Sequence, residues 1–173
     1  MVGKAIAMTI AIIIPARYAS TRFPGKPLAL IGGRSMLARV VDLAQKAAAG
    51  MDNITIAVAT EDERIADHAK SLGVACFMTP PDCPTGSDRV LAAVRQMKTR
   101  PDFIINLQGD APFTPPTVVR AVIKAWQDNP ALPVVTPVVN LRWADLDRLR
   151  ENKKTTPFSG TTCVTDFRGQ ALW

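Results

Sequence analysis

Residues 10–28 constrain the fold of this chain more than any other stretch. They begin with a run of mostly β-branched apolar residues that ends at Pro15, and a loop carrying Arg17, Arg22 and Lys26 follows directly. A continuous apolar run is typical of a strand buried on both faces of a parallel sheet. Cations at the carboxyl end of such a strand are typical of a polyphosphate site. The stretch therefore predicts an α/β protein that binds an anion where its first strand ends.

Strand-like and helix-like segments alternate along the rest of the chain. Apolar, β-branched runs predict strands at 10–14, 54–59, 74–78, 103–107 and 133–139. Helical spacing and capping residues predict helices at 36–49, 60–71, 87–98, 114–127 and 145–150, with Ser35, Thr60, Ser87 or Asp88, and Thr114 at their starts. Two short strands are expected at 161–165 and 170–173, around a turn. This order predicts right-handed βαβ units and a mainly parallel sheet with helices on both faces.

Length and composition narrow the class of protein. A chain of 173 residues with 47% hydrophobic content is long enough for one domain with a real core. The net charge of +6 suits an anionic ligand, but the cations are dispersed and aromatic residues make up only 6%, so we expect no nucleic-acid partner. The three cysteines have no CxxC spacing, which favours reduced thiols in the cytoplasm.

The N-terminus admits two interpretations. Residues 5–14 are apolar and follow Lys4, as in the apolar region of a signal peptide, but the same residues suit a buried strand, which the cationic loop after them favours. Met8 is a candidate start, so we divide the chain into an extension at 1–7 and one domain at 8–173. No run is long enough for a membrane-spanning helix, and we expect no membrane partner.

Two further polar clusters follow predicted strands or begin a predicted helix. Gln108, Gly109 and Asp110 come directly after the strand at 103–107, where a carboxylate is well placed to hold Mg²⁺ against substrate phosphates; the alternative is a turn or cap residue. Residues 84–89, PTGSDR, offer hydroxyls and open amides for reading a base edge, although a helix start needs no such function. The chain has neither the P-loop nor the dinucleotide-binding glycine pattern.

The only histidine is His68, inside a predicted surface helix, and a solvated or packing role suits it better than catalysis. The sequence therefore supports no Ser-His-Asp or Cys-His catalytic set. A bound triphosphate needs none, because cations and magnesium that orient it let a substrate hydroxyl attack the α-phosphorus with little help from an enzyme base.

Four motifs occur in an order and spacing that resemble a known family. They read IIIPARYASTRFPGKPL, VATEDERI, PTGSDRV and INLQGD, and together they extend over nearly all of the chain after Met8. This set resembles 3-deoxy-manno-octulosonate (KDO) cytidylyltransferase, also called CMP-KDO synthetase. The resemblance implies a Rossmann-like nucleotidyltransferase fold. It also implies Mg²⁺-dependent transfer of CMP from CTP to a keto-sugar acid, with release of pyrophosphate, for lipopolysaccharide synthesis by a cytoplasmic homodimer.

The resemblance also implies roles for individual residues. Arg17 and Lys26 would hold the CTP phosphates, with Ser20 near them, and Asp110 would ligate magnesium. The residues implied to line the cytidine and sugar side are Thr85, Gly86, Ser87, Arg89 and Gln108. Ala16, in the loop after the first strand, is a further implied substrate-binding residue.

The chain departs from the family pattern in two ways. Ala111 stands where the family usually has an acidic residue, which leaves 8-amino-KDO or a sialic acid open as the acceptor sugar. Family members also continue well beyond Trp173, so we expect a C-terminally incomplete domain. An inactive chain that only binds nucleotide is the alternative from a different functional class.

Overall fold

The computed structural model describes residues 8–19, 23–157 and 160–172. The proposed extension at 1–7 therefore lies outside the described residues, as does Ser20. The described chain divides into two compact units, one ending at Pro133 and the other beginning at Val134. The first unit contains the sheet and every described residue of the motifs in the resemblance.

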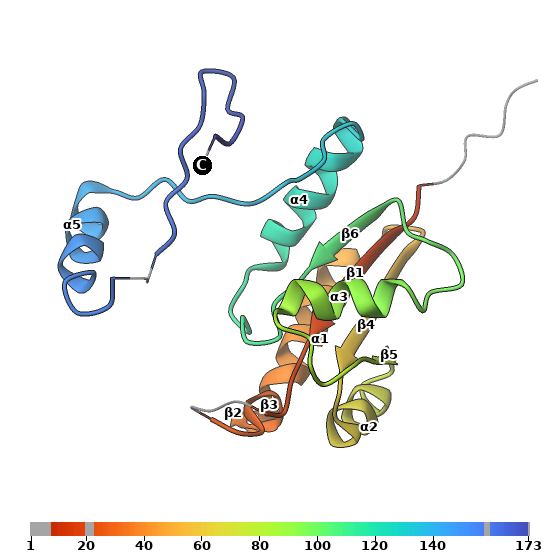
Figure 1. The fold of residues 1–173 in the computed structure, drawn as a ribbon. Helices are drawn as coiled ribbons and strands as arrows, with labels where there is room; N and C mark the ends of the chain where they lie inside the picture. Colours follow the sequence, from red (N-terminus) through yellow and green to blue (C-terminus); the bar gives the residue numbers. More distant parts are fainter. Residues whose placement is uncertain (1–7, 20–22, 158–159, 173) are drawn as a thin grey trace, which may run out of the picture. The chain divides into compact units, whose positions relative to one another are not determined.

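A parallel sheet forms the centre of the first unit (Figure 1). Its strands are β1 (Ile10–Pro15), β4 (Ile54–Thr60), β5 (Ala75–Met78) and β6 (Phe103–Asn106), in the order β5-β4-β1-β6. Each neighbouring pair is parallel. These four predicted strands are confirmed to within one residue at either end. Because all four strands run in one direction, their carboxyl ends lie at one edge of the sheet.

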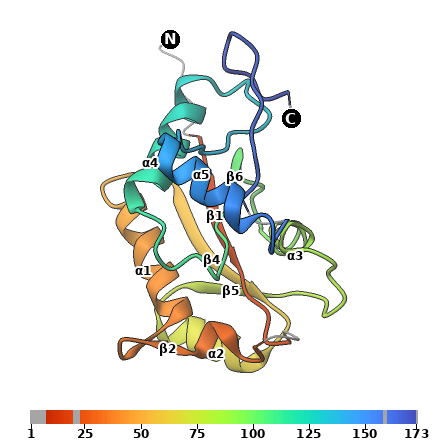
Figure 2. The same ribbon diagram turned by 90° about the vertical axis from the view of Figure 1, so that its left-hand side faces the viewer.

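Helices cover both faces of this sheet, as predicted (Figure 2). Ala11 and Ile13 of β1 belong to a buried cluster with residues of α3 (Gly86–Val94). The alternate residues of each strand point to the opposite face. There the Phe103 ring stacks on Trp126 of α4 (Pro116–Asp128) with 4.7 Å between ring centroids. Helix α1 (Met36–Ala48) packs against α4 and completes this layer.

The helix starts show where sequence patterns mislead. Ser35 caps α1 as predicted, accepting a hydrogen bond from the Ala38 amide at 3.0 Å. The prediction that Thr60 caps the next helix is wrong, because Thr60 is still hydrogen-bonded in β4; Asp62 caps α2 (Glu63–Ser71) instead. Helix α3 begins earlier than predicted, with Thr85 as the cap, because Thr85 and Asp88 exchange hydrogen bonds in a capping box.

Smaller elements lie between β1 and α1. A short 3-10 helix, η1 (Lys26–Leu28), is followed by a hairpin of β2 (Leu30–Ile31) and β3 (Arg34–Ser35) around the predicted glycine turn. His68 of α2 reaches this region, where its Nε2 lies 2.6 Å from the Ser35 hydroxyl. The single histidine therefore has a packing partner, in keeping with the role expected for it.

The second unit differs most from the sequence-based expectation. Its helix α5 (Trp143–Asn152) includes and extends the predicted segment 145–150. The strand predicted at 133–139 is wrong, because no described residue pairs with this segment, and Val134 and Val139 are largely exposed. An apolar run forms a strand only where a partner satisfies its backbone groups. The predicted strand pair at 161–165 and 170–173 reduces, among the described residues, to one antiparallel bridge between Thr165 and Ala171.

No helix within the described ranges is both long and apolar enough to cross a membrane.

A carboxylate at the opposite edge of the sheet generates a pH-dependent prediction. The Thr9 amide and hydroxyl both donate hydrogen bonds to Asp102, at 2.8 and 3.0 Å, and these bonds hold the pKa of Asp102 below its ordinary value. A lowered pKa in the folded state stabilises the fold above the unfolded pKa of about 4, and that contribution disappears as the pH falls through the folded value. We expect Asp102→Asn to lower the urea midpoint at pH 7 and to have a shrinking effect below about pH 4.

The control for this prediction is Asp82→Asn, an exposed carboxylate without a hydrogen bond or ion pair to any described residue. Its urea midpoint should follow that of the original chain at every pH. An Asp102→Asn effect of constant size across the same pH range would contradict the assignment to the ionised carboxylate.

Candidate functional site

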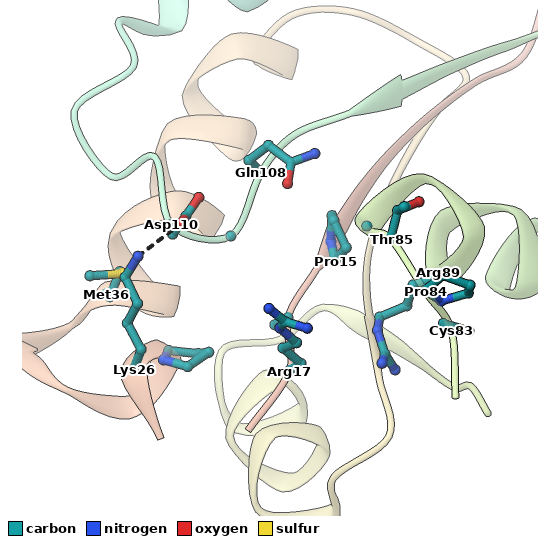
Figure 3. A pocket seen from close by; sticks show the side chains of 14 residues that line it. Pro15, Arg17, Lys26, Met36, Cys83, Pro84, Thr85, Arg89, Gln108 and Asp110 are labelled. Carbon is teal, nitrogen blue, oxygen red and sulfur yellow. Dashed lines mark hydrogen bonds and ion pairs between the residues drawn. The ribbon is translucent and has the colours of Figure 1, made fainter. Parts of the chain in front are cut away.

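A cleft of about 340 Å³ lies at the carboxyl edge of the sheet (Figure 3). Its walls come from the loop after β1, the start of α3 and the loop after β6, which the parallel order β4-β1-β6 brings together. Eight residues predicted for the site line it: Ala16, Arg17, Lys26, Thr85, Gly86, Arg89, Gln108 and Asp110. Segments nearly a hundred residues apart in the chain thus form one polar cleft, at the edge where open α/β sheets bind ligands.

Lys26 and Asp110 face each other at one end of the cleft. The Lys26 ammonium lies 2.9 Å from Oδ2 of Asp110, and their side chains are 36% and 59% exposed. Figure 3 shows this ion pair as the dashed line. An ion pair so exposed contributes only about 0–1 kcal/mol. Separating this ion pair therefore costs little free energy. Lys26 can then bind a phosphate, and Asp110 can bind a cation.

Arg17 occupies the middle of the cleft. In Figure 3 its side chain lies between the Lys26–Asp110 pair on one side and Thr85 and Arg89 on the other. The structure gives its guanidinium no ion pair or hydrogen bond to any residue in the described ranges. A guanidinium in this state keeps its full capacity for a bidentate contact with phosphate oxygens.

Arg89 has a different environment from Arg17. Its side chain is only 4% exposed, and its Nη1 lies 2.7 Å from Oε2 of Glu61 and donates to the Thr79 hydroxyl at 2.6 Å. The charge of Arg89 is thus neutralised within the wall of the cleft. Glu61 was not among the residues predicted for the site, although it belongs to the motif VATEDERI. Its position directly after β4 is the signal that could have identified it.

A series of side-chain hydrogen bonds connects the loop after β6 to the start of α3. Nε2 of Gln108 donates to Oδ1 of Asn106 at 2.8 Å, and Nδ2 of Asn106 donates to the Ser87 hydroxyl at 3.1 Å. Ser87 is therefore linked to the cleft through Asn106 and is not part of its lining. Asn106, the last residue of β6, was also missed by the sequence analysis; it orients Gln108, whose amide faces the α3 start.

Gly109 brings two strands' ends into contact. A Cβ built on Gly109 would lie 2.6 Å from the backbone oxygen of Pro15, too close for any side chain. The absence of a side chain lets the loop after β6 touch the end of β1. The positions of Gln108 and Asp110 in the cleft depend on this contact.

The residues of the cleft fit a magnesium site built on one protein carboxylate. Within the described parts of the chain, no three His, Cys, Asp or Glu side chains gather closely enough to hold a metal by themselves. Asp110 is the carboxylate that lines the cleft. Magnesium in nucleotide sites commonly takes one or two carboxylates and completes its shell with phosphate oxygens and water. Asp110 suits that arrangement and would be the protein ligand in it.

Comparison with known proteins identifies the family. Residues 11–159 match the family model described as cytidylyltransferase. The chain belongs to the cytidylyltransferase family. The matched range includes every residue of the cleft described above.

Individual relatives agree with this assignment. The chain is 43% identical to a 3-deoxy-manno-octulosonate cytidylyltransferase of Maricaulis maris over 166 residues, which are 96% of this chain and 63% of that protein. It is 36% identical to the enzyme of the same name from Chlamydia abortus, over 93% of this chain and 59% of that protein. The chain thus spans about three fifths of the length of these curated relatives.

A solved structure confirms the predicted fold. CMP:2-keto-3-deoxy-manno-octonic acid synthetase complexed with CTP superposes with a TM-score of 0.77 at 31% identity, covering 95% of this chain and 63% of that one. The Rossmann-like α/β nucleotidyltransferase fold predicted from the sequence is therefore correct. The 4-diphosphocytidyl-2C-methyl-D-erythritol synthase of Anaerococcus prevotii shares the fold at a TM-score of 0.54 and 14% identity.

The contact at Gly109 generates a prediction about stability and site geometry. In Gly109→Ala the new methyl would meet the backbone oxygen of Pro15, which has no flexible end to move aside. We expect a loss of about 1–3 kcal/mol in the free energy of unfolding, measured by urea titration. Gly86→Ala is the matched control, because its nearest atom is the movable amide oxygen of Gln108, at 3.2 Å. Equal losses in the two variants would contradict the interpretation.

Proposed function

We propose that this chain forms the nucleotide-binding part of a KDO cytidylyltransferase, which transfers CMP from CTP to KDO and releases pyrophosphate. The observation that carries the proposal is the cleft itself, in which Arg17, Lys26, Asp110 and Gln108 converge at the carboxyl edge of a parallel sheet. The relatives' names and the CTP complex of the similar structure support the choice of nucleotide and sugar.

The cleft separates naturally into a phosphate half and a base half. Lys26 and Arg17 supply the positive charge for the triphosphate, and Lys26 can turn from Asp110 to a phosphate oxygen because their ion pair is exposed. Thr85, Gly86 and Gln108 offer hydroxyl, backbone and amide groups on the other side. Such neutral donors and acceptors suit the edge of a pyrimidine base and its ribose.

The proposed cofactor is Mg²⁺, held by Asp110. When bound, it would neutralise phosphate charge and assist the departure of pyrophosphate. Arg17 and Lys26 would hold the phosphates so that the sugar hydroxyl can reach the α-phosphorus. The hydroxyl oxygen forms a bond to that phosphorus, the bond to the β-phosphate oxygen breaks, pyrophosphate keeps the electron pair, and the hydroxyl proton passes to water. The step needs little help from a general base of the protein.

The proposed acceptor sugar is KDO, and one position beside the cleft bears on this choice. Ala111, beside Asp110, leaves 8-amino-KDO or a sialic acid open as a second candidate, because the resemblance implies an acidic side chain at this position. Pyrophosphate release measured with each sugar at fixed CTP and Mg²⁺ separates these candidates. From the resemblance we also propose that the protein is a homodimer in the cytoplasm. The three unpaired cysteines of the chain suit such a reducing compartment.

The nucleotide half is tested by calorimetric titration with CTP, with ATP, GTP and UTP as controls, in the presence and absence of Mg²⁺. We expect CTP to bind selectively and more tightly with Mg²⁺. In Asp110→Asn the enhancement by Mg²⁺ should fall by about tenfold or more, because the carboxylate ligand is lost. Binding of CTP without Mg²⁺ should be no weaker than in the original chain, since Lys26 is released from its ion pair.

The matched control is Asp52→Asn, at the other edge of the sheet before β4, which should leave both affinities unchanged. A chain that binds no nucleotide, or an Asp110→Asn variant with an intact magnesium response, would overturn the proposed site.

A further inference from the structure

We propose that Glu61 is a positioning residue that joins the two sides of the nucleotide cleft. One carboxylate oxygen holds the loop that carries Arg17, and the other pairs with Arg89 at the base-side wall. Glu61 lies directly after β4 and is only 13% exposed. This inference rests on the proposed function, to which it adds a role for the motif VATEDERI.

The first half of the argument is the contact with the phosphate loop. Oε1 of Glu61 accepts a hydrogen bond from the Tyr18 amide at 3.0 Å. Tyr18 follows Arg17 directly, and the Ala16 amide is fixed to the Ala59 oxygen at 2.9 Å. The backbone on both sides of Arg17 is thus hydrogen-bonded to the end of β4. A bond to an ionised carboxylate is stronger than one between neutral groups, so the charge of Glu61 restricts where the Arg17 side chain begins.

Tyr18 transmits this restraint to Lys26. The Gly25 amide donates to the Tyr18 oxygen at 2.9 Å, and a Cβ on Gly25 would lie 3.0 Å from the Tyr18 ring. The Arg64 guanidinium lies over the Tyr18 ring, 3.3 Å from its centroid. Tyr18 is therefore held through its amide, its carbonyl and its ring. A shift of Tyr18 would therefore disturb the backbone next to both Arg17 and Lys26.

The second half of the argument is the buried ion pair. Oε2 of Glu61 lies 2.7 Å from Nη1 of Arg89, whose side chain is 4% exposed. This oxygen is buried and has no hydrogen bond of good geometry to any described residue, so its attraction to Arg89 is mainly electrostatic. Removing one charge of such a pair leaves the other buried and unbalanced. The negative charge of Glu61, as well as its shape, is therefore needed to balance the buried charge of Arg89.

The consequence is mechanical coupling between the walls. Arg89 belongs to α3, whose first turn presents Thr85 and Gly86 to the cleft. Glu61 fixes the spacing between that turn and the Arg17 loop before any nucleotide binds. A ligand that contacts both walls gains from this preorganisation, because the protein loses less freedom on binding. A nucleoside triphosphate is such a ligand.

The test compares Glu61→Gln and Glu61→Ala with Val119→Ala. Glutamine keeps the shape and the acceptor for the Tyr18 amide but loses the charge, whereas alanine loses both. Val119 is a buried residue of α4 outside the cleft lining, so its variant controls for a general loss of stability. Calorimetry with CTP and Mg²⁺ is run at a temperature at which circular dichroism shows each variant to be folded.

A second readout needs no nucleotide. Tyr18 is the only tyrosine in the sequence, so incorporated 3-fluorotyrosine reports by ¹⁹F NMR on this residue alone. We expect Glu61→Ala to shift this signal and Glu61→Gln to leave it near its original position. We expect CTP affinity to fall by about tenfold in Glu61→Gln and further in Glu61→Ala, as is usual when groups that orient a binding residue are removed. Val119→Ala should change neither.

A conservative exchange on the other partner guards against a failure to fold. Arg89→Lys keeps the positive charge beside Glu61 and should bind CTP more tightly than Arg89→Met. Affinities in both Glu61 variants equal to that of Val119→Ala would overturn the inference. If the original chain binds no CTP, the proposed function fails. The ¹⁹F signal then decides the role of Glu61 by itself. An unshifted signal in Glu61→Ala refutes that role, and a shifted signal supports it.

Discussion

The parallel pairing of β1 with β4 on one side and β6 on the other is the constraint on which the site depends. This pairing aligns three carboxyl ends at one edge, with the end of β1 at Pro15 between the ends of β4 and β6, although the three are far apart in sequence. The pairing is possible because β1 is buried along its whole length and carries small or β-branched residues toward both helical layers. The loops that carry the polar groups of the cleft therefore leave the ends of rigid, paired strands, which restricts where these loops begin.

Sequence patterns predicted those parts of the fold in which local and tertiary forces agree. The apolar runs of β1, β4, β5 and β6 pair in one parallel sheet, with β1 buried along its whole length, and their bounds were predicted closely. The run at 133–139 is also rich in valine, but it contains Pro133 and Pro137, which cannot donate a ladder hydrogen bond, and it has no strand partner in the described chain. Strand formation is decided by a partner's hydrogen bonds, which composition does not encode. Thr60 illustrates the same limit, since a good capping residue stayed in a strand because β5 pairs with it.

The site was predictable as far as residue type reveals chemistry. Cations and a carboxylate after strands stand out in a sequence, so Arg17, Lys26 and Asp110 were found, and the structure brings them to one cleft. Glu61 and Asn106 were missed, because their contribution lies in contacts with Tyr18, Arg89 and Gln108 that only the fold creates. Both residues stand at the carboxyl end of a strand, which marks their positions in the sequence. Their partners are known only when distances across the sheet edge are known.

The two ion pairs at this edge differ in a way that matches their positions. Lys26 and Asp110 form an exposed pair worth about 0–1 kcal/mol, which incoming phosphates and a cation can separate. Glu61 and Arg89 form a buried pair, and removing one partner of such a pair typically costs about 3–5 kcal/mol, so a ligand cannot separate it at comparable cost. The exposed pair therefore keeps the binding groups available, and the buried pair keeps the walls in place. A cleft for a highly charged ligand needs both kinds of pair. Lys26 and Asp110 can change partners when the ligand binds, while the buried pair keeps the surrounding walls in place.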